Sequence, residues 1–201
     1  MKYPAASETG VSTPQVLQGR DLVLSHACGD CHGGVQNPAH EGWLQGAKAS
    51  NPLSDNAIGP FKTHPRNLTP DNTTGLGRFS ERQIFNALRY GLRPGETPDV
   101  EITSSTPGQG NFPAHPKYLA PPMPWPAWRH MKDAELWAIA AYLKRGLKPV
   151  HNKVAESEGP PDFWASAYQE MPQLKLGTYP APPFPTVNER ATDAKATKGA
   201  K

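Results

Sequence analysis

Three stretches of the chain repeat apolar residues at the spacing of an amphipathic helix, and each is bounded by capping signals. The first runs from about residue 14 to 26, with Thr13 as its N-cap and Pro14 in its first turn. Its expected buried stripe consists of Val16, Leu17, Val23, Leu24 and Ala27. The pattern predicts a helix that buries one face.

The second and third helices have equally clear limits. Ser80 and Gln83 form a capping box that opens a helix through about Tyr90, and Gly91 is placed to end it. Ile84, Phe85 and Leu88 are expected to face inward. The third helix runs from about Asp133 to Arg145 and ends at Gly146. Its apolar positions have helical spacing: Leu136, Ile139, Ala140 and Leu143.

The rest of the chain is dominated by turn residues. Residues 33–79 are rich in Gly, Pro and Asn, and a Pro/Gly stretch runs from Pro94 to Pro126. No strand-like alternation is evident, so we expect an all-α fold with long Pro/Gly-rich loops. Residues 150–187 carry scattered aromatics and are expected to wrap over a surface: Phe163, Trp164, Tyr168, Tyr179 and Phe184. Residues 188–201 are expected to form a disordered basic tail.

Charge and hydropathy exclude some classes of function. The net charge is +3, and the last fourteen residues, with four basic and two acidic side chains, account for +2 of it. The body is therefore nearly neutral and lacks the basic face of a nucleic-acid-binding protein. No stretch approaches the ~20 apolar residues of a transmembrane helix. No secretory apolar region follows Met1, and we expect a leader already removed from this numbering.

Cys28-Gly29-Asp30-Cys31-His32 is the strongest chemical signal. This C-x-x-C-H spacing marks covalent attachment of haem c, in which two thiols form thioethers and the adjacent histidine binds iron. A redox dithiol is disfavoured because no βαβ pattern surrounds the motif. A zinc site is disfavoured because His40 and His64 are too scattered to complete it. One motif predicts one haem, which would also add apolar core to a chain that is only 36% hydrophobic.

The iron needs a second axial ligand or keeps an open position, and a methionine thioether is the usual partner for electron transfer. Met1 is terminal, Met171 is a weak candidate, and Met131 precedes the third helix as a core-packing residue. Met123 lies in Pro121-Pro122-Met123-Pro124-Trp125, where the prolines lower the entropy lost on fixing its sulfur. We therefore expect Met123 to bind the iron opposite His32.

Three segments together resemble class I cytochromes c, especially the single-haem modules of cytochrome subunits of bacterial membrane-associated dehydrogenases. The segments are Gly19-Arg20-Asp21-Leu22, then Asn67-Leu68-Thr69-Pro70-Asp71 with Thr74-Gly75-Leu76-Gly77-Arg78-Phe79-Ser80, and finally Met123-Pro124-Trp125 continuing through residues 131–143. The resemblance covers about residues 13–150. It implies an all-α fold in which the first and last helices cross, and it places Met123 at the sixth iron position.

Finer features follow from the same resemblance. It implies that the helices approach at Gly19, with Ile139 and Tyr142 close by. It leaves two alternatives for Gly59-Pro60: a carbonyl there accepts a hydrogen bond from the free imidazole nitrogen of His32, or the two residues form a plain turn. Lys132 stands where the family typically has a Ser or Thr cap, so Asp133 is expected to cap the last helix. Segment 94–122 is longer than the resemblance implies, and Tyr118, Trp125 and Trp128 are expected near the haem.

We therefore divide the chain into a lead (1–12), a cytochrome c domain (13–149) and an extension (150–201). The expected function is single-electron transfer as a subunit or partner of a larger extracytoplasmic redox complex, such as a dehydrogenase or oxidase. The chain would be a carrier rather than an enzyme and would reside in the periplasm or otherwise outside the cytoplasm. The alternatives are a haem enzyme or gas sensor with an open sixth position, and a structural subunit whose haem is incidental.

Overall fold

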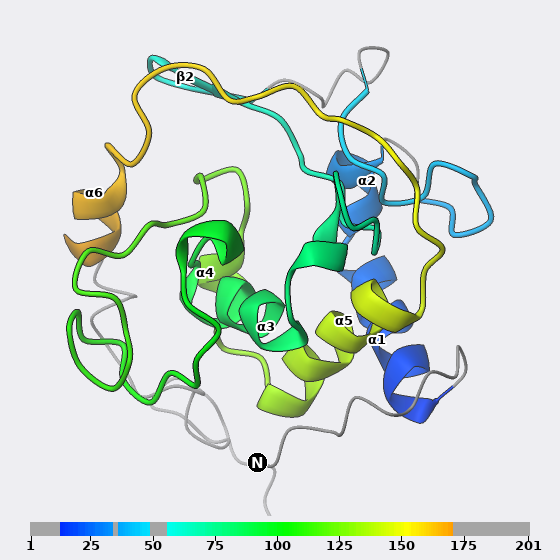
Figure 1. The fold of residues 1–201 in the computed structure, drawn as a ribbon, viewed down its shortest axis with the longest axis horizontal. Coiled ribbons are helices and arrows are strands. Elements are labelled where there is room, and N and C mark those ends of the chain that lie inside the picture. Colours follow the sequence, from blue (N-terminus) through cyan, green and yellow to red (C-terminus); the bar gives the residue numbers. More distant parts are fainter. Residues whose placement is uncertain (1–12, 34–35, 49–55, 171–201) are drawn as a thin grey trace, which may run out of the picture.

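Three helices form the centre of the protein (Figure 1). In the computed structural model, which describes residues 13–33, 36–48 and 56–170, they are α1 (Pro14–Ser25), α3 (Glu81–Tyr90) and α5 (Asp133–Arg145). α1 crosses α5, and α3 packs against another part of α5. Shorter helices are α2 (Cys28–His32), α4 (Trp125–Trp128) and α6 (Ala165–Glu170), with 3₁₀ turns at η1 (Leu76–Arg78) and η2 (Pro94–Glu96).

The predicted limits of the three long helices are confirmed by their caps. The Thr13 hydroxyl accepts a hydrogen bond from the Val16 N–H at 3.3 Å. Ser80 and Gln83 form the reciprocal capping box, with both bonds at 3.1 Å. Gly91 ends α3 with a φ of 69°, a conformation that glycine adopts without strain. These signals are local, which is why the sequence reveals them.

The start of α5 differs from expectation at one residue. Asp133 is not the N-cap, because the cap is Lys132, whose backbone N–H donates to Glu135 Oε2 at 2.9 Å. The carboxylate of Asp133 instead pairs with Arg89, which is only 2% exposed. The Met131 carbonyl also accepts from Arg89, at 2.8 Å. A buried guanidinium thus ties α3 to the start of α5.

The buried face of α1 is narrower than predicted. Val16 and Val23 are buried, but Leu17 is 49% exposed and Ala27 is also exposed, so the prediction was wrong for these two. α1 faces α5 along Val16, Gly19 and Val23, which have helical spacing, and Leu17 points away from that line. Ala27 lies beyond the helix in a left-handed conformation, with φ of 54°.

Gly19 is the point of closest approach between α1 and α5. A Cβ atom there would overlap the carbonyl oxygen of Ala138 and lie 2.8 Å from the Cβ of Tyr142. The predicted role of Gly19 and its proximity to Tyr142 are confirmed. The contacting backbone is that of Ala138, next to the expected Ile139.

Replacing Gly19 with Ala is expected to destabilise the protein by about 1–3 kcal/mol or more, the usual cost of overpacking. The sign of the change in unfolding free energy is diagnostic, because a Gly to Ala change at an unhindered helical position stabilises a protein by up to ~1 kcal/mol. Gly95→Ala is the matched control, since a Cβ there would meet nothing closer than Phe79 Cζ at 3.6 Å. Urea unfolding of both variants measures the difference. A Gly19→Ala protein as stable as the control would contradict the close packing.

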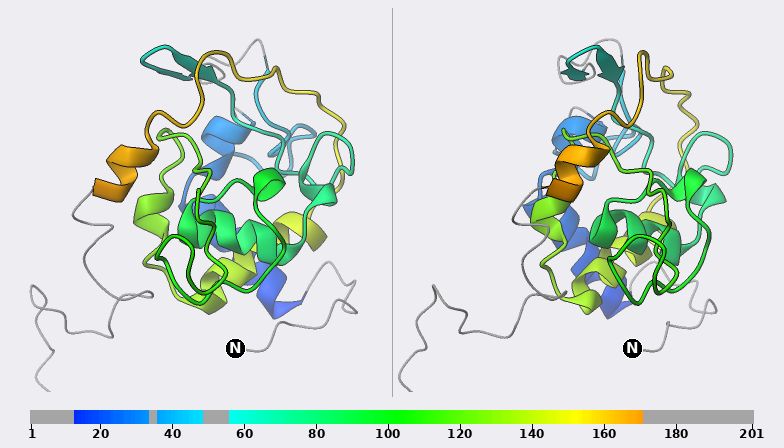
Figure 2. Two further views of the ribbon diagram at one scale, coloured as in Figure 1. Left: turned by 60° about the vertical axis from the view of Figure 1, so that its left-hand side comes forward. Right: turned by 90° about the vertical axis from the view of Figure 1, so that its left-hand side faces the viewer.

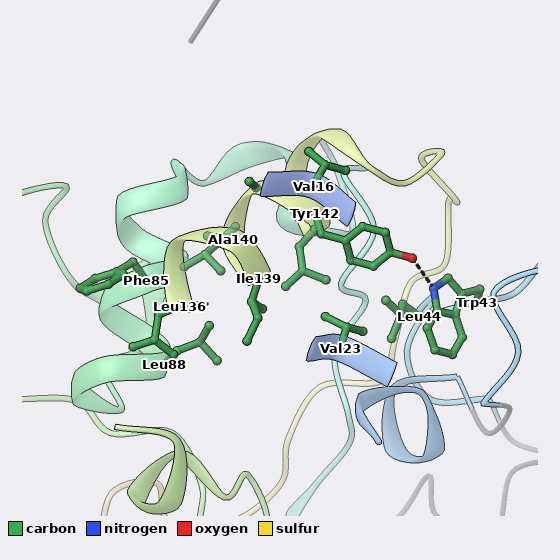
Figure 3. Close-up of a cluster of buried hydrophobic side chains, with 13 residues drawn as sticks. Val16, Val23, Trp43, Leu44, Phe85, Leu88, Leu136, Ile139, Ala140 and Tyr142 are labelled. Atoms are coloured by element: carbon green, nitrogen blue, oxygen red, sulfur yellow. Dashed lines mark hydrogen bonds between the residues drawn. The ribbon is translucent and has the colours of Figure 1, made fainter. Parts of the chain in front are cut away.

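Two clusters of buried side chains make up the core of the described part of the chain. The first lies among α1, α3 and α5 (Figure 3) and consists of Val16, Val23, Trp43, Leu44, Ile84, Phe85, Leu88, Leu136, Ile139, Ala140, Ala141, Tyr142 and Leu143. The second consists of Phe61, Leu92, Ile102, Phe112, Tyr118, Trp125, Trp164 and Tyr168. Every apolar residue predicted to face inward from α3 and α5 belongs to the first cluster, so those predictions are confirmed.

A small hairpin departs from the all-α expectation. β1 (Asn56–Ile58) pairs antiparallel with β2 (Phe61–Thr63), with Ala57 opposite Lys62. Gly59 turns the chain between them with a φ of 53°. The protein is therefore helix-rich with a two-stranded sheet. Three-residue strands are too short for alternation to be visible in the sequence.

Residues 150–168 leave the end of α5, arch past the hairpin and reach the second cluster at α6 (Figures 1 and 2). Trp164 and Tyr168 are buried there, whereas Phe163 is 45% exposed. Tyr179, Phe184 and the expected tail lie outside the described residues. Within residues 13–33, 36–48 and 56–170, no helix combines the length and the apolar character needed to span a membrane.

Candidate haem site

The C-x-x-C-H motif forms its own short helix, α2, immediately after α1. Cys28 opens this helix and His32 closes it. Two residues spaced by three lie on the same side of a helix, so both thiols face one direction. Cys28 is half-buried against the first cluster, while Cys31 is exposed. This places one thiol at the edge of the core and the other at the surface.

Trp43 fixes α2 against the core, a role that sequence reasoning missed. Its indole N–H donates to the Tyr142 hydroxyl of α5 at 3.0 Å (Figure 3). Its ring also packs so closely on Gly29 that a Cβ at that position would overlap it. The Gly29 N–H donates to Gln36 Oε1 at 3.1 Å. The residue directly after Cys28 must therefore be small, which only the folded contact reveals.

His32 is held in one ring orientation by a backbone carbonyl. Its Nδ1 lies 2.7 Å from the Arg66 carbonyl oxygen. Because a carbonyl only accepts, Nδ1 carries the proton and the Nε2 lone pair is available to a metal. Burial lowers the pKa of His32, while this hydrogen bond raises it. Of the two alternatives for Gly59-Pro60, the plain turn is confirmed, because these residues connect β1 and β2, and the acceptor of the His32 hydrogen bond is Arg66 instead.

The thiols are kept protonated by their surroundings. Burial raises the pKa of Cys28 to about 11, helped by Cys31 and Asp30. Burial and then Asp30 also raise the pKa of Cys31. Reactive redox dithiols need a lowered thiol pKa, so the environment disfavours that alternative. Among the described residues, no three His, Cys, Asp or Glu side chains gather closely enough to hold a metal ion between them.

Met123 lies in a tight turn between the two clusters. Its N–H donates to the Ala120 carbonyl at 3.0 Å, and its carbonyl accepts from the Trp125 N–H at 2.9 Å. The side chain is half-buried against the first cluster, the same cluster that Cys28 contacts. Two hydrogen bonds and three neighbouring prolines thus restrict the backbone that carries this sulfur.

Met131 has a firm structural role of its own. Its side chain packs against the first cluster, its N–H donates to the Trp128 carbonyl at 2.9 Å, and Arg89 binds its carbonyl. Its predicted packing role is confirmed. Met1 and Met171 lie outside the described residues.

The three aromatic residues expected beside the haem take different positions. Tyr118 and Trp125 stack in the second cluster, with ring centroids 5.7 Å apart. Trp128 contacts His26, which lies two residues before Cys28, edge to face at 5.9 Å. α4 therefore joins the Met123 turn to the end of α1, just before the haem motif. Their proximity to a haem stays a prediction.

The Asn67 motif organises the loop that presents Arg66. The buried Asn67 carboxamide accepts from the Thr69 N–H at 2.9 Å and donates to the Thr74 hydroxyl and the Val150 carbonyl at 3.0 and 2.8 Å. Arg66 and Leu68 flank it, and the Leu68 N–H donates to the Leu44 carbonyl at 2.9 Å. The motif thus supports the acceptor of the His32 hydrogen bond.

The donor set suits a haem c. Two protonated thiols on one side of a helix match addition to the two vinyl groups of one porphyrin. A histidine with a free Nε2 supplies an axial ligand, and a restrained thioether is available for the other. Cys28 and Met123 also share the apolar surface of the first cluster.

Comparison with known proteins identifies several cytochrome subunits of bacterial dehydrogenases as relatives. The fructose dehydrogenase cytochrome subunit of Gluconobacter japonicus is 26% identical over 138 residues, which cover 68% of this chain and 22% of that protein. The alcohol dehydrogenase (quinone) cytochrome c subunit of Gluconacetobacter polyoxogenes is 26% identical over 148 residues, covering 74% and 24%. The gluconate 2-dehydrogenase cytochrome c subunit of Pantoea cypripedii is 25% identical over 161 residues, covering 80% and 30%.

The chain thus spans between about a fifth and a third of the length of these relatives. No protein-family model matches it. The three relatives nevertheless agree with one another in type and with the resemblance carried by the sequence motifs. The homologues of this chain are cytochrome c subunits of bacterial dehydrogenases.

Proposed function

We propose that the chain carries one covalent haem c and transfers single electrons. Cys28 and Cys31 form the thioethers, His32 binds the iron, and Met123 binds it from the opposite side. The observation that carries the proposal is the 2.7 Å contact between His32 Nδ1 and the Arg66 carbonyl. It fixes the tautomer that a haem-binding histidine needs, on the same short helix as both thiols.

Each part of the site then has a defined role. Bound haem supplies the iron that changes oxidation state. His32 donates electron density from Nε2, which its hydrogen bond to Arg66 increases. The thioether of Met123 favours the ferrous state and raises the potential. The apolar side chains of the first cluster, against which Cys28 and Met123 pack, would exclude water from a haem held by these residues and so lessen the reorganisation that accompanies each electron transfer.

The wider context is proposed from the relatives. We place this chain in a dehydrogenase-type redox complex outside the cytoplasm, where it accepts electrons from a catalytic subunit or an equivalent partner. It has no substrate of its own. In this view, α1 and α5 form the crossed pair of a cytochrome c fold that encloses a single haem. Segment 150–201 is proposed as an extension of a domain ending near residue 149.

The haem-loaded full chain is expected to contain one haem and to titrate as a one-electron couple. Because Met123 fills the sixth position, the ferric protein should bind cyanide slowly. Haem content per chain, a spectroelectrochemical titration and stopped-flow mixing with cyanide measure these properties. Rapid cyanide binding would favour the open-site haem enzyme or gas sensor. Co-purification from the native organism identifies the redox partner.

A further inference from the structure

Residues 150–168, here called the brace, follow α5 and connect two distant parts of the molecule. In Figures 1 and 2 the brace leaves the end of α5, passes the hairpin β1–β2 and ends in α6. Its first half contacts the loop that holds His32. Its second half contacts the aromatic cluster that contains Trp125, two residues after Met123.

The start of the brace supports the histidine loop from two sides. The Val150 carbonyl accepts from Asn67 Nδ2 at 2.8 Å. Asn152 Nδ2 donates to the Gln45 carbonyl at 2.8 Å. The next residue, Gly46, donates its N–H to the carbonyl of His32 at 2.7 Å. Asn152 Nδ2 also donates to the Ala47 carbonyl at 3.3 Å, and the Ala47 N–H donates at 2.8 Å to the carbonyl of Pro65, the residue before Arg66. Asn152 is therefore connected both to the backbone of His32 and to the loop that carries the acceptor of its ring.

Arg66 connects the brace to His32 through a single residue. Its carbonyl accepts from His32, and its guanidinium donates to the Ala155 carbonyl and the Ser157 hydroxyl, both at 3.0 Å. Glu156 also lies 3.6 Å from the guanidinium. The guanidinium and the carbonyl both belong to Arg66. Displacement of residues 155–157 would therefore disturb the carbonyl that accepts the hydrogen bond from His32.

The middle of the brace is fastened to the hairpin. Lys62 and Glu158 exchange two backbone hydrogen bonds, both 2.8 Å long. Gly159, with φ of 93°, follows directly, and a Cβ there would overlap the Pro60 carbonyl oxygen. Main-chain bonds and this close approach set the register of the brace on β2.

The far end of the brace packs beside the Met123 turn. Tyr168 contacts Trp125 and Tyr118, with centroids 5.1 and 5.5 Å apart. Trp164 contacts Phe61 at 4.9 Å. Asp162 binds Arg93 at 2.5 Å and Lys117 at 3.2 Å. The Trp125 N–H in turn donates to the Met123 carbonyl.

We propose that the brace positions both axial ligands of the haem, with Asn152 acting on the His32 side and Tyr168 on the Met123 side. This proposal rests on the ligation proposed above. The two ends should act in opposite directions. Loosening the hydrogen bond from His32 Nδ1 to the Arg66 carbonyl makes the imidazole a weaker electron donor to the iron. This destabilises the ferric state and raises the midpoint potential. Loosening the Met123 turn weakens the iron–sulfur bond, which lowers the potential and admits other ligands.

The test compares Asn152→Ala and Tyr168→Leu in the haem-loaded full chain. Asn152→Ala is expected to raise the midpoint potential and leave the methionine–iron charge-transfer absorption in place. Tyr168→Leu is expected to lower the potential, weaken that absorption and speed cyanide binding about 10-fold or more. Lys153→Ala and Ser166→Ala are matched controls, because both side chains are exposed within the same segment. If Tyr168→Leu does not accumulate, Trp164→Phe replaces it.

The outcomes separate the two proposals. The wild type could show the methionine–iron absorption while Asn152→Ala and Tyr168→Leu behave like their controls. That result would overturn the proposed role of the brace and leave the Met123 ligation standing. Shifts of the same sign at both ends would also overturn it, because general loosening does not distinguish the ligands. A wild-type protein without that absorption would overturn the Met123 ligation and the brace with it.

Discussion

The Cys28→Ala/Cys31→Ala double variant is expected to lose all covalently held haem, while the wild-type chain keeps its haem through denaturation and acid–organic extraction. Thioethers survive conditions that dissociate a ligand held by iron coordination and packing alone. Each single variant should retain haem through one bond, with a shifted spectrum because one vinyl group stays conjugated. Haem absorbance of the denatured, extracted chain measures all four proteins.

A variant of the proposed axial ligand Met123 serves as the matched control for loss of covalent haem. Met123→Leu leaves both thiols intact and should retain covalent haem in the same assay. Haem that extracts freely from the wild-type chain would reject thioether attachment at Cys28 and Cys31.

The long helices were predictable because their signals are short in range. Thr13 caps α1, and the Ser80–Gln83 box caps α3 through residues three positions apart. Gly146 follows the last turn of α5. Such signals operate within one turn, so no tertiary contact is needed to interpret them. The errors on α1, at Leu17 and Ala27, arose where tertiary packing decides which residues are covered.

The hairpin and the path of the brace were not visible in the sequence. β1 and β2 are three residues long, and their stabilising contact comes from Glu158, almost a hundred residues later. The acceptor for His32 was missed for the same reason. A carbonyl has no sequence signature, and Arg66 reaches His32 only because Asn67 and its partners fold the intervening loop.

The candidate site shows the same division between local and distant information. The attachment motif is continuous in sequence, so spacing alone identifies its three residues. Trp43 carries no motif, and its contact with Tyr142 joins positions that lie 99 residues apart. Met123 stands between these cases, since its prolines are local signals whereas its position relative to the iron depends on the whole fold.

Met123 and Met131 provide the sharpest test of the iron ligation, because the same Met to Leu change can be made at both. Met123→Leu is expected to abolish the methionine–iron charge-transfer absorption and to lower the midpoint potential, since leucine has no sulfur to donate. Met123→Ala should do the same and admit cyanide more rapidly. Covalent haem should persist in both. Optical spectra, redox titration and stopped-flow ligand binding provide the measurements.

Met131→Leu controls for loss of a methionine from the same apolar surroundings. Both side chains are half-buried against the first cluster, and the exchange is close to volume-conserving, so it should cost under ~1.5 kcal/mol of stability. Its iron spectrum should match the wild type. The reverse pattern would make Met131 the ligand, although Arg89 and the Trp128 carbonyl already hold its backbone. Unchanged spectra in both variants would instead favour an open sixth position or one filled by another group, of which Met171 is the weak candidate from the sequence.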